Sequence, residues 1–257
     1  MMTLTPLVSI VVPARNLSNY IVETLTSIVN QTYQNIEIIV VDDHSTDDTR
    51  KKVLSINDSR IYLIDSYGKN GPAGSRNTGI QQAKGKYLSF IDGDDQIHPY
   101  FIETLVEQLE SNQLAKIATV KFAWDASISD FNQNQMKKPN VKWQKIHKQQ
   151  MFAGVTTSGH LISGMVFNKL YNLEMIKESG VLFNEDLQLA EDHLWIAQLI
   201  ASKNSGDIFF FSPAVMYYKV NRGGSIIHTA TKEMRAIEQE VNSLISRIGD
   251  NLNKRYI

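Results

Sequence analysis

The chain has 257 residues, of which 42% are hydrophobic and 21% charged, a composition typical of a globular protein with one large domain. Its formal net charge of -1 provides no positive field for nucleic acid, and the lack of cysteine excludes disulfides, thiolate metal sites and a cysteine nucleophile. No apolar run reaches the roughly 18 residues that span a bilayer, so we expect a cytoplasmic protein, with peripheral association at the inner face of the plasma membrane as a further expectation.

The first half of the chain alternates short β-branched runs with amphipathic segments. This alternation predicts an α/β fold with a mostly parallel sheet flanked by helices. The first helix carries an apolar stripe with Ser18 as its N-cap, and Ser45, Pro72 and Pro99 mark the starts of the next three helices. We expect the strands at residues 7–12, 36–41, 60–64, 87–91 and 117–122.

Between residues 123 and 150 the periodicity fades and polar residues accumulate, which indicates a mobile surface excursion. Its lysines form either an ordinary solvated face, the commoner outcome of such a run, or a surface for a phosphorylated acceptor or a membrane. These lysines are Lys137, Lys138, Lys142, Lys145 and Lys148.

From Thr231 onward, apolar residues recur at spacings of three and four, which predicts one long amphipathic helix. Such a helix is marginal unless its apolar face is covered, so we expect its stripe to pack on the same chain, on a second copy or on a further domain. The stripe comprises Met234, Ile237, Val241, Leu244, Ile248 and Leu252.

Polar residues follow the expected strands at the points where they end. Residues 13–16 follow the first strand, Asp42 and Asp43 the second, and residues 92–95 the fourth. Because the carboxyl ends of parallel strands share one rim of the sheet, we expect these segments to converge on a single crevice. The rim is therefore the expected site of function.

The segment at 92–95 carries three carboxylates, those of Asp92, Asp94 and Asp95, within four residues. They repel one another unless a cation or water shields them, and Mg²⁺ or Mn²⁺ is the natural partner because it takes oxygen ligands and leaves positions open for substrate phosphates. Gly93 would let the backbone approach the ligand closely. The alternative is an acidic turn that caps the helix near Pro99.

Two further segments carry candidate groups. Residues 70–79 form a glycine-bearing loop that enters a helix, where free N–H groups and Arg76 suit a phosphate or a nucleobase; an ordinary surface ion pair of Arg76 fits equally well. Glu191 and Asp192 open an apolar helix, where carboxylates often only complement the helix dipole. Proximity to the acidic run would instead indicate a catalytic pair.

Taken together, five ordered segments of the chain resemble glycosyltransferase family 2 of the GT-A fold, over about residues 7–218. They are residues 8–13, 41–47, 73–79, 92–95 and 191–192. The resemblance implies a Rossmann-like GT-A fold, a nucleotide-sugar donor that is commonly uridine-linked, and Mn²⁺ or Mg²⁺ on its diphosphate. We expect a GT-A catalytic domain at 1–230, with a nucleotide-binding half at 1–122 and an acceptor and catalytic half at 123–230. The C-terminal amphipathic extension at 231–257 lies outside the resemblance, and because no proline stops it before Ile257 we expect it to lead towards a further domain.

The resemblance also implies roles for individual residues. Asp192 is the general base and Glu191 its supporting neighbour. The nucleotide-binding positions are Pro13, Ala14, Arg15, Asn16, Asp42, Asp43, Arg76, Asp92 and Gly93. The metal positions are Asp94, Asp95 and His228, and the region of the donor sugar and acceptor contains Gly164, Lys169 and Arg222. Arg15 and His44 stand where many members have Tyr and Gly.

A carboxylate that takes the acceptor proton opposite a leaving nucleoside diphosphate inverts the anomeric carbon in one displacement. Transfer with retention is the alternative, because some relatives of the fold retain the configuration. The expected function is therefore metal-dependent, inverting transfer from a UDP-sugar to a glycan, glycolipid or glycoprotein acceptor, with self-association through the C-terminal helix as a further expectation. One alternative is a catalytically silent sugar-binding or scaffold protein on the same fold. Another is a sugar-phosphate nucleotidylyltransferase, which needs a glycine-rich loop after the first strand that residues 13–17 do not supply.

Overall fold

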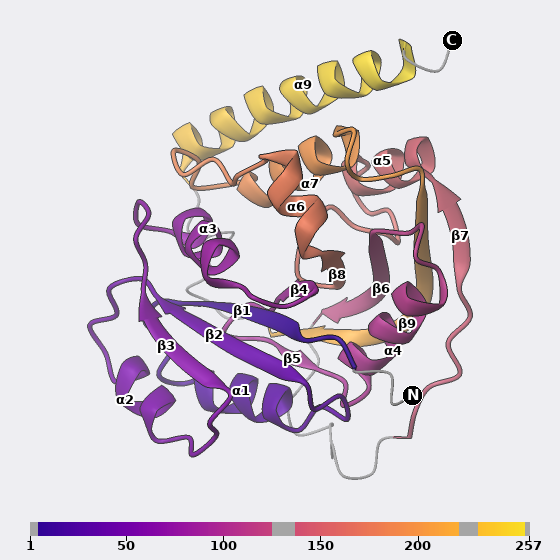
Figure 1. Cartoon of the computed structure of the whole chain (residues 1–257). Helices are drawn as coiled ribbons and strands as arrows, with labels where there is room; N and C mark the ends of the chain where they lie inside the picture. The colour runs from indigo at the N-terminus through magenta and orange to yellow at the C-terminus, as the bar shows by residue number, and fades with distance from the viewer. Residues whose placement is uncertain (1–4, 125–136, 221–230, 255–257) are drawn as a thin grey trace.

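The computed structural model describes residues 5–124, 137–220 and 231–254. Within these ranges nine strands form one sheet in the order β3-β2-β1-β4-β8-β6-β9-β5, and β7 pairs with β9 (Figure 1). The strands are β1 Val8–Ala14, β2 Ile36–Asp42, β3 Ile61–Asp65, β4 Tyr87–Phe90, β5 Gln96–Ile97, β6 Ile117–Trp124, β7 Gln144–His147, β8 Lys169–Asn172 and β9 Ile208–Lys219.

Helices cover both faces of this sheet (Figure 1). They are α1 Ile21–Val29, α2 Thr49–Leu54, α3 Pro72–Gln82, α4 Phe101–Ser111, α5 Lys148–Thr156, α6 Leu173–Ser179, α7 Glu191–Ala201 and α9 Lys232–Lys254. The predicted α/β fold with a C-terminal helix is therefore confirmed.

The sheet has a parallel half and a mixed half. Strands β3, β2, β1 and β4 run parallel to one another, as the sequence predicts. Beyond β4 the pattern changes, because β8 is antiparallel to both β4 and β6 whereas β6 and β9 are parallel. The second half of the chain thus completes the sheet by returning strands to it in both directions.

Two hydrophobic layers bury the parallel strands β1, β2 and β4 on both faces, whereas the edge strand β3 is partly exposed. Alternate side chains along a strand point to opposite faces, so Val11 of β1 packs with Ile80 of α3 while Val12 packs with Leu25 of α1. Both layers are closed to water, which explains the continuous apolar runs of these strands. The polar residues that follow these strands therefore lie at the edge of the hydrophobic core.

Both predicted serine caps are wrong. Helix α1 begins at Ile21 without a side-chain cap, and the backbone N–H of Ser18 instead donates to Asp47 Oδ2 at 3.0 Å. Helix α2 begins at Thr49, and the hydroxyl oxygen of Ser45 accepts from the backbone N–H of Asn16 at 3.0 Å. Both serines thus take part in hydrogen bonds between the β1–α1 and β2–α2 loops and do not cap the helices.

The expected surface excursion is only partly correct. Residues 125–136 lie outside the described ranges, but residues 144–150 contribute β7 and the start of α5, because β7 pairs with the long strand β9. Lys148 is only 6% exposed and its Nζ donates to Ser202 O at 3.0 Å, so its place on a solvated face is wrong. The four other lysines of the run are exposed, and Lys138 donates to Glu103 and Glu107.

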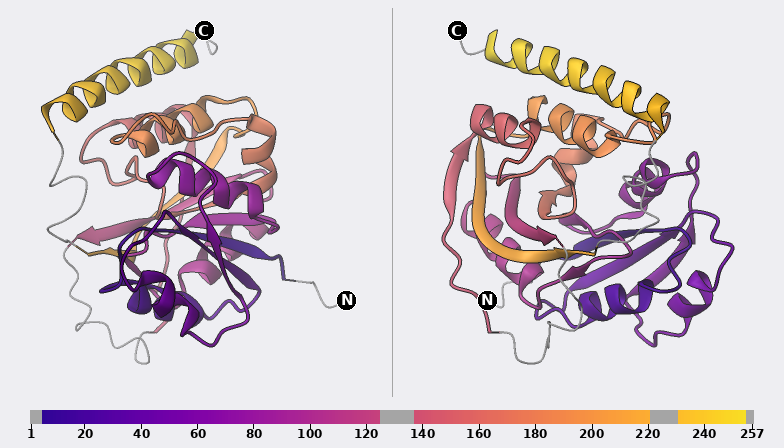
Figure 2. Two further views of the ribbon diagram at one scale, coloured as in Figure 1. Left: turned by 90° about the vertical axis from the view of Figure 1, so that its left-hand side faces the viewer. Right: turned by 180° about the vertical axis from the view of Figure 1, so that it is seen from behind.

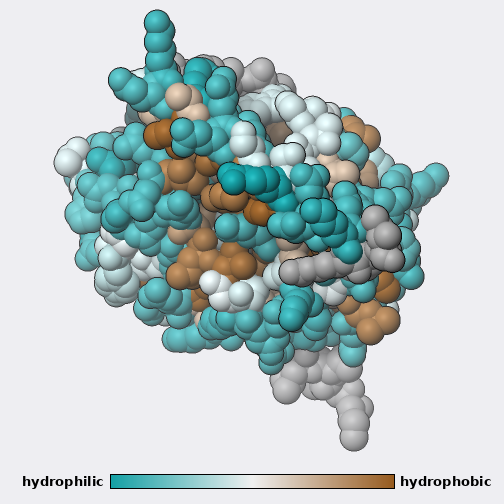
Figure 3. Space-filling view, turned by 90° about the horizontal axis from the view of Figure 1, so that it is seen from above, coloured by the Kyte–Doolittle hydropathy of each residue, from teal (hydrophilic) through white to brown (hydrophobic). Residues whose placement is uncertain are grey.

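Helix α9 lies along α7 and α5, as Figures 1 and 2 show from three sides. Val241, Ile245 and Leu252 enter the hydrophobic core, whereas Ile237 and Leu244 are 41% and 37% exposed. The buried stripe is therefore rotated from the predicted one, and it packs on the same chain. The side of the molecule on which α9 lies is mainly hydrophilic, with separate hydrophobic patches (Figure 3). No helix in the described ranges is long and apolar enough to cross a membrane.

Replacing Ile245 by alanine should lower the free energy of unfolding by about 2 kcal/mol, because it removes buried methyl groups between α9 and the core. Leu244→Ala is the matched control on the exposed side of the same helix and should change it by about 0.5 kcal/mol or less. Urea unfolding measures both variants. Equal small effects would show that α9 does not stabilise the domain.

Candidate active site

The three polar segments predicted to share one rim of the sheet do meet there. Ala14 at the end of β1 is in register with Asp42 at the end of β2, and the backbone N–H of Asp43 donates to Ala14 O at 2.8 Å. On the other side of β1, the Ile91 N–H donates to Val11 O at 3.0 Å, which places Asp92 directly after the neighbouring strand. Parallel pairing therefore brings the ends of β1, β2 and β4 together at this rim.

The carboxylate of Asp43 joins three loops at this rim. Its side chain is 3% exposed, and its Oδ2 accepts from Arg15 Nη1 at 3.1 Å and from the Gly71 N–H at 2.8 Å. The neighbouring Asp42 is equally buried and accepts from Arg50 Nη1 at 2.9 Å. Asp42 Oδ1 is buried and has no hydrogen-bond partner among the described residues. A loop that follows β1, the end of β2 and the entry to α3 are thereby held together.

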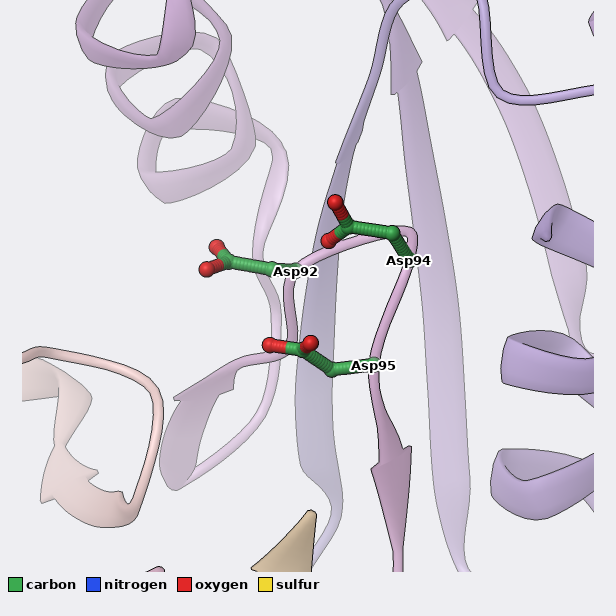
Figure 4. Close-up of side chains that lie close together, drawn as sticks. All are labelled: Asp92, Asp94 and Asp95. Atoms are coloured by element: carbon green, nitrogen blue, oxygen red, sulfur yellow. The ribbon is translucent and has the colours of Figure 1, made fainter. Parts of the chain in front are cut away.

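The acidic turn after β4 gathers three carboxylates on one side of the backbone (Figure 4). One carboxylate oxygen from each of Asp92, Asp94 and Asp95 lies within 4.8 Å of the others. Such a set of hard oxygen donors fits Mg²⁺ or Mn²⁺. The backbone at Gly93 lies close to the β1–α1 connection and not only to a ligand site, since a Cβ at this position would lie 2.8 Å from Pro13 O.

Asp95 is the most enclosed member of the acidic turn, with no exposed surface. Its Oδ2 accepts from the Tyr217 hydroxyl at 2.7 Å and its Oδ1 from the Val220 N–H at 2.9 Å. Burial raises the pKa of Asp95 to about 7, and the charges of Asp92 and Asp94 act in the same direction. The ionised turn therefore depends on nearby cations.

Arg76 is the cation that joins the acidic turn to α7. It is 5% exposed, and it donates from Nη2 to Asp92 Oδ1 at 3.0 Å and from Nη1 to Glu191 Oε1 at 2.8 Å. Burial alone would lower the pKa of Arg76, but the charges of Asp92, Glu191 and Asp192 raise it. The alternative of an ordinary surface ion pair is wrong for this residue.

Glu191 and Asp192 form the first turn of α7 and differ in their surroundings. Glu191 is 7% exposed, and burial together with the charge of Asp192 raises its pKa while Arg76 opposes the shift. Asp192 is partly exposed, and its Oδ1 accepts from the His193 N–H at 2.8 Å. A dipole-complementing role can account for that last contact but not for the buried Glu191–Arg76 pair.

Lys169 lies fully buried beneath the segment at 162–168. Its Nζ donates to Met165 O at 2.6 Å, to Asn168 Oδ1 at 2.7 Å and to Ser163 O at 2.9 Å, and Ile162 O lies 3.3 Å away. Burial lowers the pKa of Lys169 to about 7, and the charge of Asp192 acts against this. The hydrogen bonds of Lys169 Nζ hold this segment from inside the protein.

Gly164, in the same segment, packs against the start of α7. A Cβ at this position would lie 2.8 Å from His193 Cδ2 and 2.4 Å from Val155 O. The segment that Lys169 holds thus lies beside the helix that carries Asp192. Arg222 and His228, the other residues expected near the donor, lie outside the described ranges.

Backbone strain in the described residues is concentrated at these same positions. The non-glycine residues with positive φ are Asn16 at 51°, His44 at 55°, Ser163 at 63° and Ala190 at 62°. Each lies within two residues of an expected site residue. Such conformations cost roughly 1–3 kcal/mol each and persist where surrounding contacts fix them, which is common at active sites.

Tyr217 and Lys219 reach the acidic turn from β9. The family resemblance includes both in a run at 217–225 that is expected to lie over the bound diphosphate, but it gives neither residue a role at the acidic turn. Lys219 Nζ donates to Asp92 Oδ2 and to Asp95 Oδ2, both at 3.1 Å. Burial would lower the pKa of Lys219, but Asp92 and Asp95 raise it above its usual range. The sequence signal available for Lys219 was a lysine at the end of an apolar run. Its position beside the acidic turn depends on the pairing of β9 with β5.

Residues 9–174 match the family described as Glycosyl transferase family 2. The chain belongs to this family. The predicted resemblance is thus confirmed.

Relatives and solved structures agree with this assignment. The chain is 37% identical over 130 residues to Glycosyltransferase GlyG of Streptococcus pneumoniae, covering 50% of this chain and 43% of that protein. It is 44% identical over 115 residues to the UDP-Glc:alpha-D-GlcNAc-diphosphoundecaprenol beta-1,3-glucosyltransferase WfaP of Escherichia coli, covering 45% and 43%. The matched regions cover 43% of the length of each of these two relatives, so the chain spans less than half of either protein.

Among solved structures, S. aureus TarS 1-349 in complex with UDP-GlcNAc has a TM-score of 0.73 at 22% identity. The similarity covers 94% of this chain and 66% of that chain. It confirms the GT-A fold of the family 2 chain.

Replacing Arg76 by methionine should lower the free energy of unfolding by about 3 kcal/mol or more, since the buried Glu191 and the partly buried Asp92 lose the cation that they share. Lys86→Met is the control, because it removes the exposed ion pair with Glu110 and should change the value by about 1 kcal/mol or less. Urea unfolding at neutral pH compares the two variants. A loss for Arg76→Met no larger than the control would contradict a linking role.

Proposed function

We propose that this chain is a metal-dependent, inverting glycosyltransferase that uses a UDP-sugar as donor. The observation that carries the proposal is the Arg76 guanidinium, which bonds both to Asp92 of the acidic turn and to Glu191 beside Asp192. The buried Arg76 side chain thereby fixes two groups relative to each other. One is the acidic turn, which is suited to hold a metal ion bound to a diphosphate, and the other is the start of α7, where Asp192 is suited to accept a proton. Retaining both sets of carboxylates has no purpose in a silent binding protein.

The nucleoside binds, on this proposal, at the rim formed by residues 13–16, Asp42 and Asp43. The buried carboxylates there can accept hydrogen bonds from a base and a ribose, and Asp42 Oδ1 has no partner within the described residues. The printed names of two similar proteins support a uridine donor: WfaP uses UDP-Glc, and TarS binds UDP-GlcNAc.

The acidic turn would hold Mn²⁺ or Mg²⁺ through carboxylate oxygens of Asp92, Asp94 and Asp95. The ion would act as a Lewis acid that stabilises the negative charge of the leaving diphosphate. His228, expected as a further ligand, lies outside the described ranges.

Asp192 accepts the proton of the acceptor hydroxyl on this proposal. The hydroxyl oxygen forms a bond to the anomeric carbon as the bond from that carbon to the diphosphate oxygen breaks, so the configuration inverts. Asp192 is partly exposed at the start of α7 and can be reached by an acceptor, whereas Glu191 is occupied by Arg76. Lys169 positions the segment at 162–168 beside this base.

The acceptor we infer is a lipid-linked glycan. WfaP acts on alpha-D-GlcNAc-diphosphoundecaprenol, and another relative is the GalNAc(5)-diNAcBac-PP-undecaprenol beta-1,3-glucosyltransferase of Campylobacter jejuni, 26% identical over 231 residues. Such an acceptor would bring the enzyme to the cytoplasmic face of a membrane as a peripheral protein. Release of UDP from a panel of UDP-sugars with Mn²⁺, with and without a diphosphoundecaprenol glycan, identifies the donor and tests the acceptor class.

Asp192→Asn should lower sugar transfer by about 10²–10⁴-fold, because it removes the proton acceptor while it keeps the shape of the side chain. Donor affinity should change little, since Asp192 contacts the acceptor. Asp186→Asn is the control for an exposed aspartate, which pairs with Lys69 on the surface. Steady-state transfer and calorimetric donor binding give the two readouts.

Transfer by Asp192→Asn at nearly the wild-type rate would contradict the base assignment. A wild-type protein that binds UDP-sugars but never releases UDP would favour the catalytically silent alternative.

A further inference from the structure

Lys219 places a positive charge of the chain itself inside the acidic turn. Its Nζ lies 3.1 Å from both Asp92 Oδ2 and Asp95 Oδ2, and its side chain is 14% exposed. The aromatic rings of Phe167 and Trp124 enclose it, with centroids 4.8 and 5.9 Å from Nζ. The ammonium thus occupies a built position rather than a chance surface contact.

The two cations at the turn have different partners. Arg76 divides its guanidinium between Asp92 Oδ1 and Glu191, whereas Lys219 contacts the other oxygen of Asp92 and the enclosed Asp95. Asp95 otherwise accepts only from the neutral Tyr217 hydroxyl and the Val220 N–H among the hydrogen bonds described. Lys219 therefore balances the charge of Asp95 when no other cation is near.

A divalent ion and this ammonium cannot both use the same oxygens. Mg²⁺ bonds carboxylate oxygens at about 2.0–2.1 Å, which is closer than an ammonium approaches, and two cations at that spacing repel strongly. Lys219 is the last residue of β9, and its long side chain can turn without moving the strand.

We propose that Lys219 is an internal cation that competes with the divalent ion for Asp92 and Asp95, so that metal binding requires the ammonium to leave the turn. The inference rests on the metal-dependent function proposed above. Because the ammonium of Lys219 must first leave these carboxylates, the metal ion binds weakly in the absence of nucleotide. A nucleoside diphosphate gives the displaced ammonium a new anionic partner, so metal and nucleotide bind more tightly together than separately.

The test is calorimetric binding of Mn²⁺ alone to chelator-treated protein. Lys219→Met keeps most of the apolar stem but removes the charge, and it should bind Mn²⁺ about tenfold more tightly than the wild type. Lys219→Arg retains a competing cation and should stay within about threefold of the wild type. Lys86→Met removes a lysine from a remote surface pair and should match the wild type.

A thermal readout covers the case in which Lys219→Met is less stable without metal. Saturating Mn²⁺ should then raise its melting temperature by more than that of the wild type, since the ion replaces the lost charge. Adding UDP should tighten Mn²⁺ binding by a larger factor in the wild type than in Lys219→Met.

Equal or weaker Mn²⁺ binding by Lys219→Met would overturn the competition and leave the proposed glycosyltransferase activity intact. Failure of the wild type to release UDP from any UDP-sugar would count against the activity itself. The two results come from separate measurements and are therefore distinguishable.

Discussion

The site depends on the neutralisation of carboxylates that lie at the carboxyl edge of the sheet. Asp92, Asp95 and Glu191 are all largely enclosed, and an unpaired buried charge costs several kcal/mol. Arg76 from α3 and Lys219 from β9 supply the balancing charges. Because each cation contacts two carboxylates, the ion pairs also fix α3, α7 and β9 around the acidic turn. The ion pairs that balance the charge of the site consequently also determine its geometry.

The parallel half of the sheet could be predicted because its signals are local. Apolar runs define β1, β2 and β4, and the polar residues that follow them meet at one rim wherever the strands are parallel. The serine caps failed for the opposite reason, since Ser18 and Ser45 bond to another loop rather than to their own helix. A local cap signal does not reveal a tertiary partner.

The mixed half could not be predicted in the same way. The two-residue strand β5 has no periodicity of its own and exists because Gln96 and Ile97 pair with Tyr218 and Tyr217. That pairing brings Lys219 to the acidic turn, and the antiparallel strand β8 brings Lys169 beneath the segment beside α7. Conformations with positive φ at Ser163 and Ala190 likewise follow from these long-range contacts. The residue types of the site, including Arg76 and Lys169, were therefore predictable, but the contacts of Lys219 with the acidic turn were not.

The most direct test of this account is a crystal structure of the protein with Mn²⁺ and UDP, with anomalous diffraction measured at the manganese edge. The account predicts one strong anomalous peak at the oxygens of the 92–95 turn, next to the diphosphate, and Lys219 Nζ beyond hydrogen-bonding distance of Asp92 and Asp95. A diphosphate bound with no manganese at the turn, and with Lys219 still on both carboxylates, would contradict it.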